Sequence, residues 1–408
     1  MPPAMSVKMR TRSGLRRAIL ALPCLLMGCD RPKGSESQSD EQERVSLTES
    51  QLDSVFSLTG DEVGLGATDP DLAAEQRNGD LALVDRRDQR VAFYDSAGRP
   101  RAQIGRRGQG PGEFEDIEGV FALPGDTVMI FDRTRQIGYL YHESRATNTR
   151  VDFRNWQFTA NRGQVLLGRF ADGRWVALAG QPRPLMKEGV RVGTDSIHLL
   201  AGVPEATPSR FATIARVKQV DLVTSGYSYR FDLNEVAAGA GAVCEGGVIL
   251  ADTTGVRLLS VGGKLAWSTS HPFPRTSIER FGGIDAIVNR QFAGVVPGAL
   301  AEKAQTALRE IGQGVDSAMN QVLIDARGII WYPRPGVKKG TAYVLYADRK
   351  ELQQRFSAPG AHRIGSRFLL SLSVDPDLEV AKYTAFRVNS SINDAHTGVG
   401  WCFGQFRW

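Results

Sequence analysis

A β-hairpin pattern recurs at a fixed interval in the first part of the chain. Residues 79–99, GDLALVDRRDQRVAFYDSAGR, and residues 125–144, GDTVMIFDRTRQIGYLYHES, share a glycine turn, an apolar strand, an aspartate, a polar turn and a second apolar strand. Asp85 and Asp132 are 47 residues apart, and so are Tyr94 and Tyr141. Self-similarity at such a period is typical of repeat folds, in which each unit buries its apolar surface against its neighbours.

Four weaker copies follow, so that six hairpin cores are predicted in all. They lie at residues 172–180, 245–267, 325–352 and 365–388. The strands LALV, VMIF and VILA are apolar at every position, whereas a strand with one face in water alternates polar and apolar residues. Each sheet should therefore be covered on both faces, as in radially stacked four-stranded sheets. We predict an all-β, six-bladed β-propeller over residues 53–388.

A glycine-rich motif joins the two clear hairpins and is followed by a strand, an aspartate and a turn. Its defining residues are Gly105, Gly108, Gly110, Pro111, Gly112, Glu113 and Phe114. The motif resembles the blade signature of six-bladed propeller lipoproteins of bacteria, which are related to NHL-repeat propellers. The resemblance covers about residues 56–388 and is clearest in the first two blades.

The same loop has to be weighed as a phosphate site. Such a site needs a helix after the loop, whose N-terminal amides face the anion. Residues 115–131 instead return to strand, and no Gly-Lys-Ser or Gly-Lys-Thr is present. We interpret the glycines as allowing positive φ at a crossing between blades, with Phe114 filling the gap between sheets. Glu113 is expected to accept hydrogen bonds from backbone N–H groups.

Aspartates stand at the same place in three hairpins, namely Asp85, Asp132 and Asp252. Each begins a polar turn, which favours an Asx turn in which the carboxylate accepts a backbone N–H bond. The alternative is a ring of carboxylates around a metal in the central channel. The five histidines show no metal-ligand spacing, and no nucleophile motif is present. No cofactor or metal ligand is predicted, while a Ca or Zn ion in the channel stays open.

The charges argue against a nucleic-acid protein. The chain has 50 Lys and Arg residues against 45 Asp and Glu residues, and five of the basic residues lie in residues 1–28. Without that segment the chain is balanced, so it lacks the positive charge of a polyanion binder. Arginines crowd the first hairpin and the loop after it, at positions 86, 87, 90, 99, 101, 106 and 107. We expect the turns and the crossing at opposite ends of the sheets, and therefore no single patch.

The N-terminus predicts an exported protein. Residues 1–28 are basic at first and then apolar, which is typical of a secretory signal peptide. They end in Leu26-Met27-Gly28-Cys29, which resembles the bacterial lipobox and implies cleavage before Cys29 and lipidation of its thiol. A plain cleaved signal is the alternative. Residues 30–44 contain no large apolar residue, so a flexible tether is predicted over residues 29–52, with the protein on the periplasmic face of the inner or outer membrane.

Three further features of the sequence bear on the fold. Residues 277–321 predict a helical insertion, which either covers apolar surface or acts as a lid. Residues 389–408 show no repeat and predict an irregular tail outside the ring, because a strand near Phe56 could close the propeller. Cys244 and Cys402 either form a disulfide or leave Cys244 as a buried free thiol.

The sequence favours a binding protein over an enzyme. A rigid ring with variable loops suits recognition of a protein or glycan ligand, and we expect a monomer held at a membrane by its lipid. The alternatives are a metal-dependent hydrolase or lyase with its site in the channel, and a structural component of a cell-envelope complex.

Overall fold

The computed structural model describes the second of two compact units, Met1–Ser46 and Leu47–Trp408. The described residues are 49–51, 54–59, 72–158, 164–180, 187–224, 227–233, 239–252, 254–270, 273, 275–295, 297–313, 315, 317–319, 322–333, 341–347, 350–358, 361–364, 367–374, 381–387 and 400–407. The predicted signal peptide, Cys29 and the tether up to residue 48 lie outside them, as do residues 388–399.

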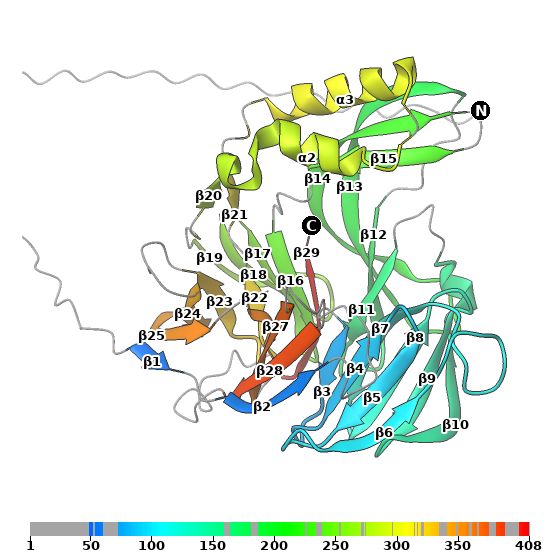
Figure 1. Ribbon diagram of the computed structural model, residues 1–408, viewed down its shortest axis with the longest axis vertical. Coiled ribbons are helices and arrows are strands. Elements are labelled where there is room, and N and C mark those ends of the chain that lie inside the picture. The colour runs from blue at the N-terminus through cyan, green and yellow to red at the C-terminus, as the bar shows by residue number, and fades with distance from the viewer. Residues whose placement is uncertain are drawn as a thin grey trace, which may run out of the picture. The chain divides into compact units, whose positions relative to one another are not determined.

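The described part of the second unit is built mainly from six sheets of four or five strands (Figure 1). The first sheet contains β3 (Ala73–Glu75), β4 (Leu81–Asp85), β5 (Arg90–Tyr94) and β6 (Pro100–Ile104). The second contains β7 (Ile117–Leu123), β8 (Thr127–Asp132), β9 (Ile137–His142) and β10 (Arg145–Asp152). The third contains β11 (Val165–Arg169), β12 (Trp175–Ala179), β13 (Gly189–Gly202), β14 (Ser209–Val223) and β15 (Ser228–Asp232).

The remaining three sheets take strands from both ends of the chain. The fourth contains β16 (Gly239–Cys244), β17 (Gly247–Asp252), β18 (Gly255–Ser260), β19 (Leu265–Ser270) and β29 (Cys402–Arg407). The fifth contains β22 (Leu323–Ile324), β23 (Ile330–Pro333), β24 (Thr341–Ala347), β25 (Lys350–Ala358) and β1 (Glu49–Gln51). The sixth contains β26 (Ala361–Ile364), β27 (Phe368–Val374), β28 (Ala381–Arg387) and β2 (Ser54–Thr59).

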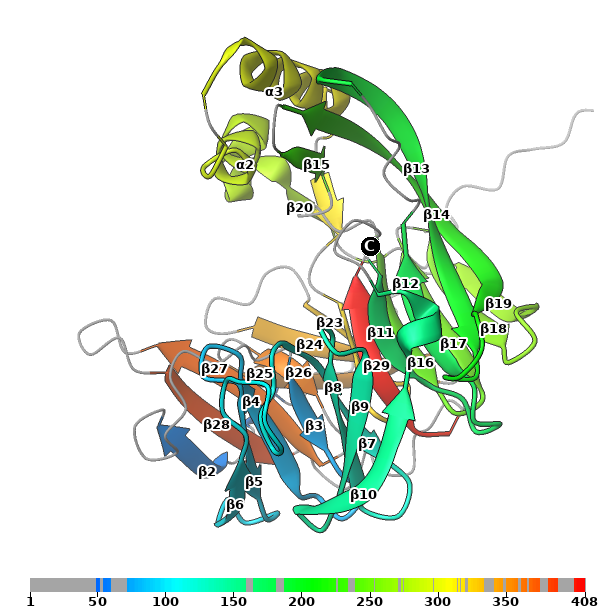
Figure 2. The same ribbon diagram turned by 90° about the vertical axis from the view of Figure 1, so that its right-hand side faces the viewer.

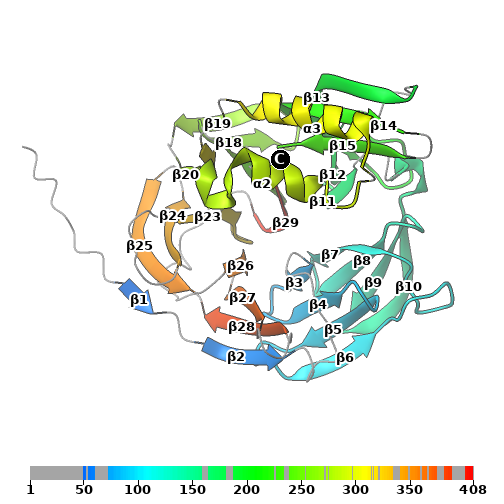
Figure 3. The ribbon, with the colours of Figure 1, turned by 45° about the horizontal axis from the view of Figure 1, so that its top comes forward.

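The first strands of successive sheets contact one another in chain order. β3 contacts β7, β7 contacts β11, β11 contacts β16, β16 contacts β22 and β22 contacts β26. Of these strands, β3, β7, β11 and β26 are labelled in Figure 3. The series returns to its start, because the Glu75 carboxylate of β3 accepts hydrogen bonds from the backbone N–H groups of Arg367 and Phe368. This arrangement is consistent with a β-propeller. The all-β prediction is confirmed, and the number of blades stays a prediction.

Each clear hairpin buries both of its faces, as its apolar strands predict. In β4, Ala82 and Val84 pack against the second sheet, while Leu81 and Leu83 pack against the sixth. In β8, successive residues pack alternately into two buried clusters. One cluster is shared with the first sheet and the other with the third. Alternate side chains of a strand point to opposite faces, so a strand between two sheets must be apolar throughout.

Both ends of the chain complete sheets made from distant segments. β2 pairs antiparallel with β28, which agrees with the expected closing strand near Phe56. β1 pairs parallel with β25, so the predicted tether of residues 29–52 extends too far. A polar composition did not prevent this pairing, because a strand at the edge of a sheet needs only its backbone groups to bond.

The C-terminal residues correct the prediction of an irregular tail. β29 pairs with β16 on the side away from β17, and it also contacts β11 and β7. It is therefore an additional innermost strand of the fourth sheet (Figure 3). Cys402 and Cys244 form a disulfide, so Cys244 is not a free thiol. The tail sequence shows no hairpin signal because its partner strand lies far away in the chain.

The predicted insertion contains α2 (Gly283–Gln291) and α3 (Ala299–Gly312). The short 3-10 helix η3 (Ile278–Phe281) precedes them, and β20 (Arg275–Ser277) pairs with β21 (Ser317–Met319) at the base. Leu308 of α3 and Val288 of α2 share a buried cluster with Leu222 and Phe231 of the third sheet. The helices thus cover the apolar face of the long β13–β14 hairpin and β15 (Figure 2).

Candidate binding face

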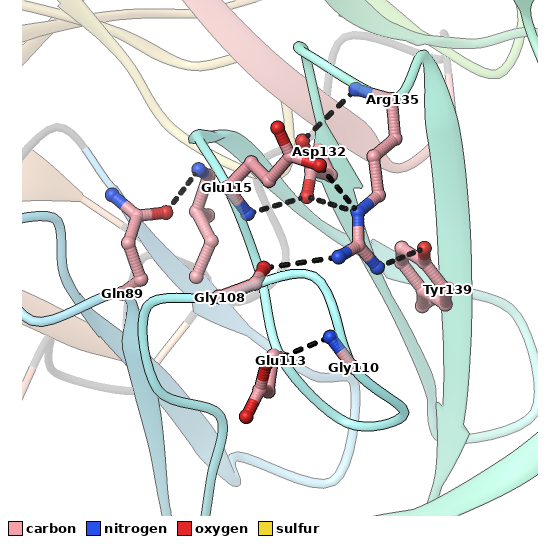
Figure 4. A network of polar contacts seen from close by, with 9 residues as sticks. Gln89, Gly108, Gly110, Glu113, Glu115, Asp132, Arg135 and Tyr139 are labelled. Carbon is pink, nitrogen blue, oxygen red and sulfur yellow. Dashed lines mark hydrogen bonds and ion pairs between the residues drawn. The ribbon is translucent and has the colours of Figure 1, made fainter.

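The loop between β6 and β7 folds around the carboxylate of Glu113 (Figure 4). This carboxylate accepts a hydrogen bond of 2.7 Å from the backbone N–H of Gly110 and one of 2.6 Å from Nε of Arg106. The Gly110 N–H group, followed by Arg106, lowers the pKa of Glu113. A Cβ on Gly108 would collide with this carboxylate, which explains the glycine. Pro111 and Gly112 form the exposed tip of the loop.

Phe114 anchors the end of the same loop. Its side chain is 1 % exposed and lies in the cluster between the first and second sheets. It packs edge-on against Tyr139, with ring centroids 5.6 Å apart. Gly105 has a φ of +84°, and its backbone lies so close that an added Cβ would be 2.7 Å from the carbonyl oxygen of Gln89. The loop is a tight crossing between two sheets, and a strand rather than a helix follows it.

Arg135 ties the crossing to the second sheet (Figure 4). It donates hydrogen bonds of 2.9 Å to the carbonyl oxygen of Gly108 and of 3.1 Å to Oη of Tyr139. Its Nε donates to Oε1 of Glu115 at 3.3 Å and lies 3.7 Å from Oδ2 of Asp132. Asp132 also accepts the backbone N–H of Glu115 at 2.8 Å. The turn after β8 and the crossing therefore lie at the same end of the sheets.

Each of the three turn aspartates accepts a hydrogen bond within its own turn. Asp85 accepts the backbone N–H of Asp88, Asp132 that of Arg135, and Asp252 that of Thr254. Each bond closes an Asx-type turn. The described part of the chain contains no group of three or more His, Cys, Asp or Glu residues arranged to hold a metal.

Several of the arginines crowded in the first hairpin and the following loop lie at the same end of the sheets. From the sequence alone they are expected at opposite ends. Nη2 of Arg107 in the crossing donates to the carbonyl oxygen of Arg87 in the β4–β5 turn at 3.1 Å. The β4–β5 turn and the crossing therefore lie at the same end of the sheets. This is the end at which the chain passes from β6 to β7, the first strand of the second sheet. Arg99 and Arg101 are paired elsewhere, with Asp95 and Asp80. We call this end the crossing face, defined by Arg86, Arg87, Arg107, Asp116, Glu118 and Arg133.

Glu118 is the most deeply buried of three residues of this face that the sequence analysis missed, the others being Asp116 and Arg133. It lies in the innermost strand β7, and its side chain is 9 % exposed. Oε1 accepts a hydrogen bond from Nη1 of Arg133 at 2.8 Å, whereas Oε2 is buried and receives no hydrogen bond from any described residue. Burial raises its pKa to about 7; Asp116 adds to the rise, while Arg133 and Arg86 oppose it. A single carboxylate within the apolar strand IEGVFAL was the available signal.

Two more exposed charges lie beside Glu118. Nη2 of Arg86 and Oδ1 of Asp116 are 3.9 Å apart, and the two side chains are 43 % and 37 % exposed. The backbone N–H of Arg133 donates to the carbonyl oxygen of Asp116 at 2.9 Å. Two carboxylates and two guanidinium groups are thus brought together by the β4–β5 turn, the start of β7 and the β8–β9 turn.

The opposite end of the sheets is tied together by the C-terminal segment. The backbone N–H and C=O of Trp401 bond to Glu245, whose carboxylate pairs with Arg77 of the first sheet. Arg77 also lies over the Trp401 ring, 5.4 Å from its centroid. The backbone N–H of Cys402 donates to the carbonyl oxygen of Ala326 in the fifth sheet. Residues 400–402 therefore bridge turns of the first, fourth and fifth sheets.

The comparisons with known proteins give no family. No family model matches the chain, and no curated protein matches it. Among solved structures, an exported protein from Bacteroides fragilis is 12% identical, with coverage of 83% of this chain and 97% of the other and a TM-score of 0.42. Virginiamycin B lyase from Staphylococcus aureus is 6% identical, with coverage of 81% and 98% and a TM-score of 0.36. A calcium-binding regucalcin from Agrobacterium tumefaciens is 12% identical, with coverage of 83% and 96% and a TM-score of 0.33. Such distant likenesses carry no argument about function.

Proposed function

We propose that this chain is a lipid-anchored, extracytoplasmic six-bladed β-propeller that binds a ligand or partner protein on its crossing face, without catalysis. The lipobox ending in Cys29 supports the anchor, and the six sheets of four or five strands support the blade count. None of the described helices has the length and apolar character needed to cross a bilayer.

The difference between the two ends of the sheets carries the proposal. At one end the segment of residues 400–402 bonds to Glu245 and Ala326 and occupies the region between turns. The crossing face instead presents exposed charged side chains, including Arg87 and Arg107, for which no acidic partner is found among the described residues. Charged groups on turns that the sheets hold in place suit recognition, because the backbone that carries them is already ordered before binding.

A capture experiment on the full-length protein tests this assignment. Detergent-solubilised wild type is compared with Arg87→Ala/Arg107→Ala and with Lys264→Ala/Lys303→Ala, whose exposed side chains lie in the β18–β19 turn and in α3. We expect the envelope component retained by wild type to be lost from the arginine variant and kept by the lysine variant. Equal retention by all three proteins would contradict a binding role of the crossing face. Loss of Cys29→Ala from the membrane fraction tests the lipid anchor separately.

One observation favours a second candidate, a hydrolase or lyase. A carboxyl group with a pKa of about 7, such as that of Glu118, can accept and release a proton at neutral pH, as a general acid–base catalyst does. Metal analysis of the purified protein tests the metal-dependent form of this candidate. A stoichiometric Ca or Zn ion, lost when an acidic residue of the crossing face is replaced, would support the enzyme over the binding module.

A further inference from the structure

We infer that Glu118 and Arg133 form the centre of a binding site for a small zwitterion, a molecule with an ammonium and a carboxylate a few bonds apart, such as a free α-amino acid. The inference rests on the proposed binding function and names its ligand class. Its starting point is the buried Oε2 of Glu118, for which the described residues supply no donor. A buried acceptor without a donor costs about 1–3 kcal/mol, so a ligand donor placed there gains affinity.

The surrounding groups select the charge pattern of the ligand. Arg133 uses Nη1 for Glu118, and its 24 % exposed side chain keeps further N–H donors that point to no described acceptor. A ligand ammonium can donate to Oε2 of Glu118 while its carboxylate accepts from Arg133. Asp116 and Arg86 repeat the same pair of charges beside them. Two acids and two guanidinium groups match a zwitterion better than a purely anionic or purely cationic ligand.

We place the ligand's approach to Glu118 at the pair of Arg86 and Asp116 that lies next to it. Arg86 and Asp116 are both exposed, and their charged atoms are 3.9 Å apart, beyond hydrogen-bond length. Exposed pairs of this kind contribute little stability, so a ligand can replace their mutual contact with its own. The buried Glu118–Arg133 pair stays in place, because the adjacent backbone bond between Arg133 and Asp116 holds the β8–β9 turn against the start of β7.

Calorimetric titration of the full-length protein tests the ligand class. The probes are the common L-amino acids, and for each one that binds, its N-acetyl and amide forms, which each lack one charge. We expect binding of at least one amino acid and a loss of tenfold or more in affinity for both derivatives. Glu118→Gln should lose tenfold or more in affinity for the amino acid. The control is Asp88→Asn, which removes a carboxylate from the β4–β5 turn, and it should bind as wild type does.

The pH dependence separates ligand contact from a structural role. An ammonium requires ionised Glu118, so the wild-type affinity should fall by up to tenfold per unit as pH is lowered from about 7 to 5. Arg133, Arg86 and Asp116 are the charged groups that act on Glu118. The α-ammonium and α-carboxylate of an amino acid keep their charges in this range, so histidine, whose side chain titrates there, is left out of this series. Proton release near pH 7 should appear as a dependence of the binding heat on the buffer, and it should be absent in Glu118→Gln.

Two results would overturn the inference. One is the absence of binding of every amino acid to folded wild-type protein. The other is equal affinity and equal pH dependence of wild type and Glu118→Gln. If no amino acid binds while the wild type still retains the envelope component that Arg87→Ala/Arg107→Ala loses, the zwitterion site is wrong and the binding role of the crossing face stands.

Discussion

Cys402 lies directly opposite Cys244 in the register of β29 and β16, and the two residues form a disulfide. The bond links positions 158 residues apart and fastens the C-terminal strand to the middle of the chain. It also holds Trp401 beside Glu245, where the turns of three sheets meet.

Removing the disulfide should destabilise the protein markedly. We expect Cys402→Ser to lower the free energy of unfolding by about 2–5 kcal/mol, because the bond restricts the unfolded chain over a long loop. Chemical denaturation with and without reductant measures the effect. Reductant should destabilise the wild type and leave Cys402→Ser unchanged, so an equal response of both proteins would count against a stabilising bond.

Glu118 should make stability depend on pH. Burial raises its pKa from 4.5 to about 7, so the folded state holds a proton that the unfolded state releases above pH 4.5. The wild type should therefore lose stability relative to Glu118→Gln as pH rises from about 4.5 to about 7, by on the order of 3 kcal/mol. Denaturation of both proteins at several pH values checks this, and a difference that does not change with pH would refute it.

Gly105 and Gly112 form a matched pair for the crossing. Both have positive φ, +84° and +75°, so alanine strains the backbone at either position. At Gly105 the new Cβ would also approach the carbonyl oxygen of Gln89 and the ring of Phe114, whereas none of the described residues comes within 4 Å of a Cβ at Gly112. We expect Gly112→Ala to cost about 1 kcal/mol and Gly105→Ala clearly more. Equal losses in thermal denaturation would show that the close approach is unimportant.

Asp132 should matter more than the equivalent Asp252. The Asp132 side chain is fully buried. It accepts the backbone N–H of Arg135 in the β8–β9 turn and that of Glu115 in the crossing. Asp252 is partly exposed, accepts the backbone N–H of Thr254 in its own turn and pairs with Arg257 of β18. We expect Asp132→Ala to cost about 2–4 kcal/mol, since two donors lose their acceptor, and Asp252→Ala about 1 kcal/mol. Urea denaturation of both variants gives the comparison, and a larger loss for Asp252→Ala would contradict it.

Much of the fold was accessible from short stretches of sequence. Strands such as LALV are apolar at every position, and that pattern alone requires cover on both faces. The turn role of Asp85 and the tight loop around Gly105 also follow from neighbouring residues, because an Asx turn and a positive φ are local properties. The expected separation of the arginines was wrong because it depended on which ends of two sheets meet.

The sequence by itself determined the repeated hairpins, their turns and the helical insertion, since each of these needs interactions over only a few residues. Only the tertiary structure decided the place of β29, the pairing of Cys402 with Cys244 and the surroundings of Glu118. The backbone edge of β16 accepts a strand whatever its side chains, so no pattern in residues 402–407 announces the pairing. The pKa of Glu118 likewise depends on burial and on Arg133, Asp116 and Arg86, whose distances are set by the packing of separate turns.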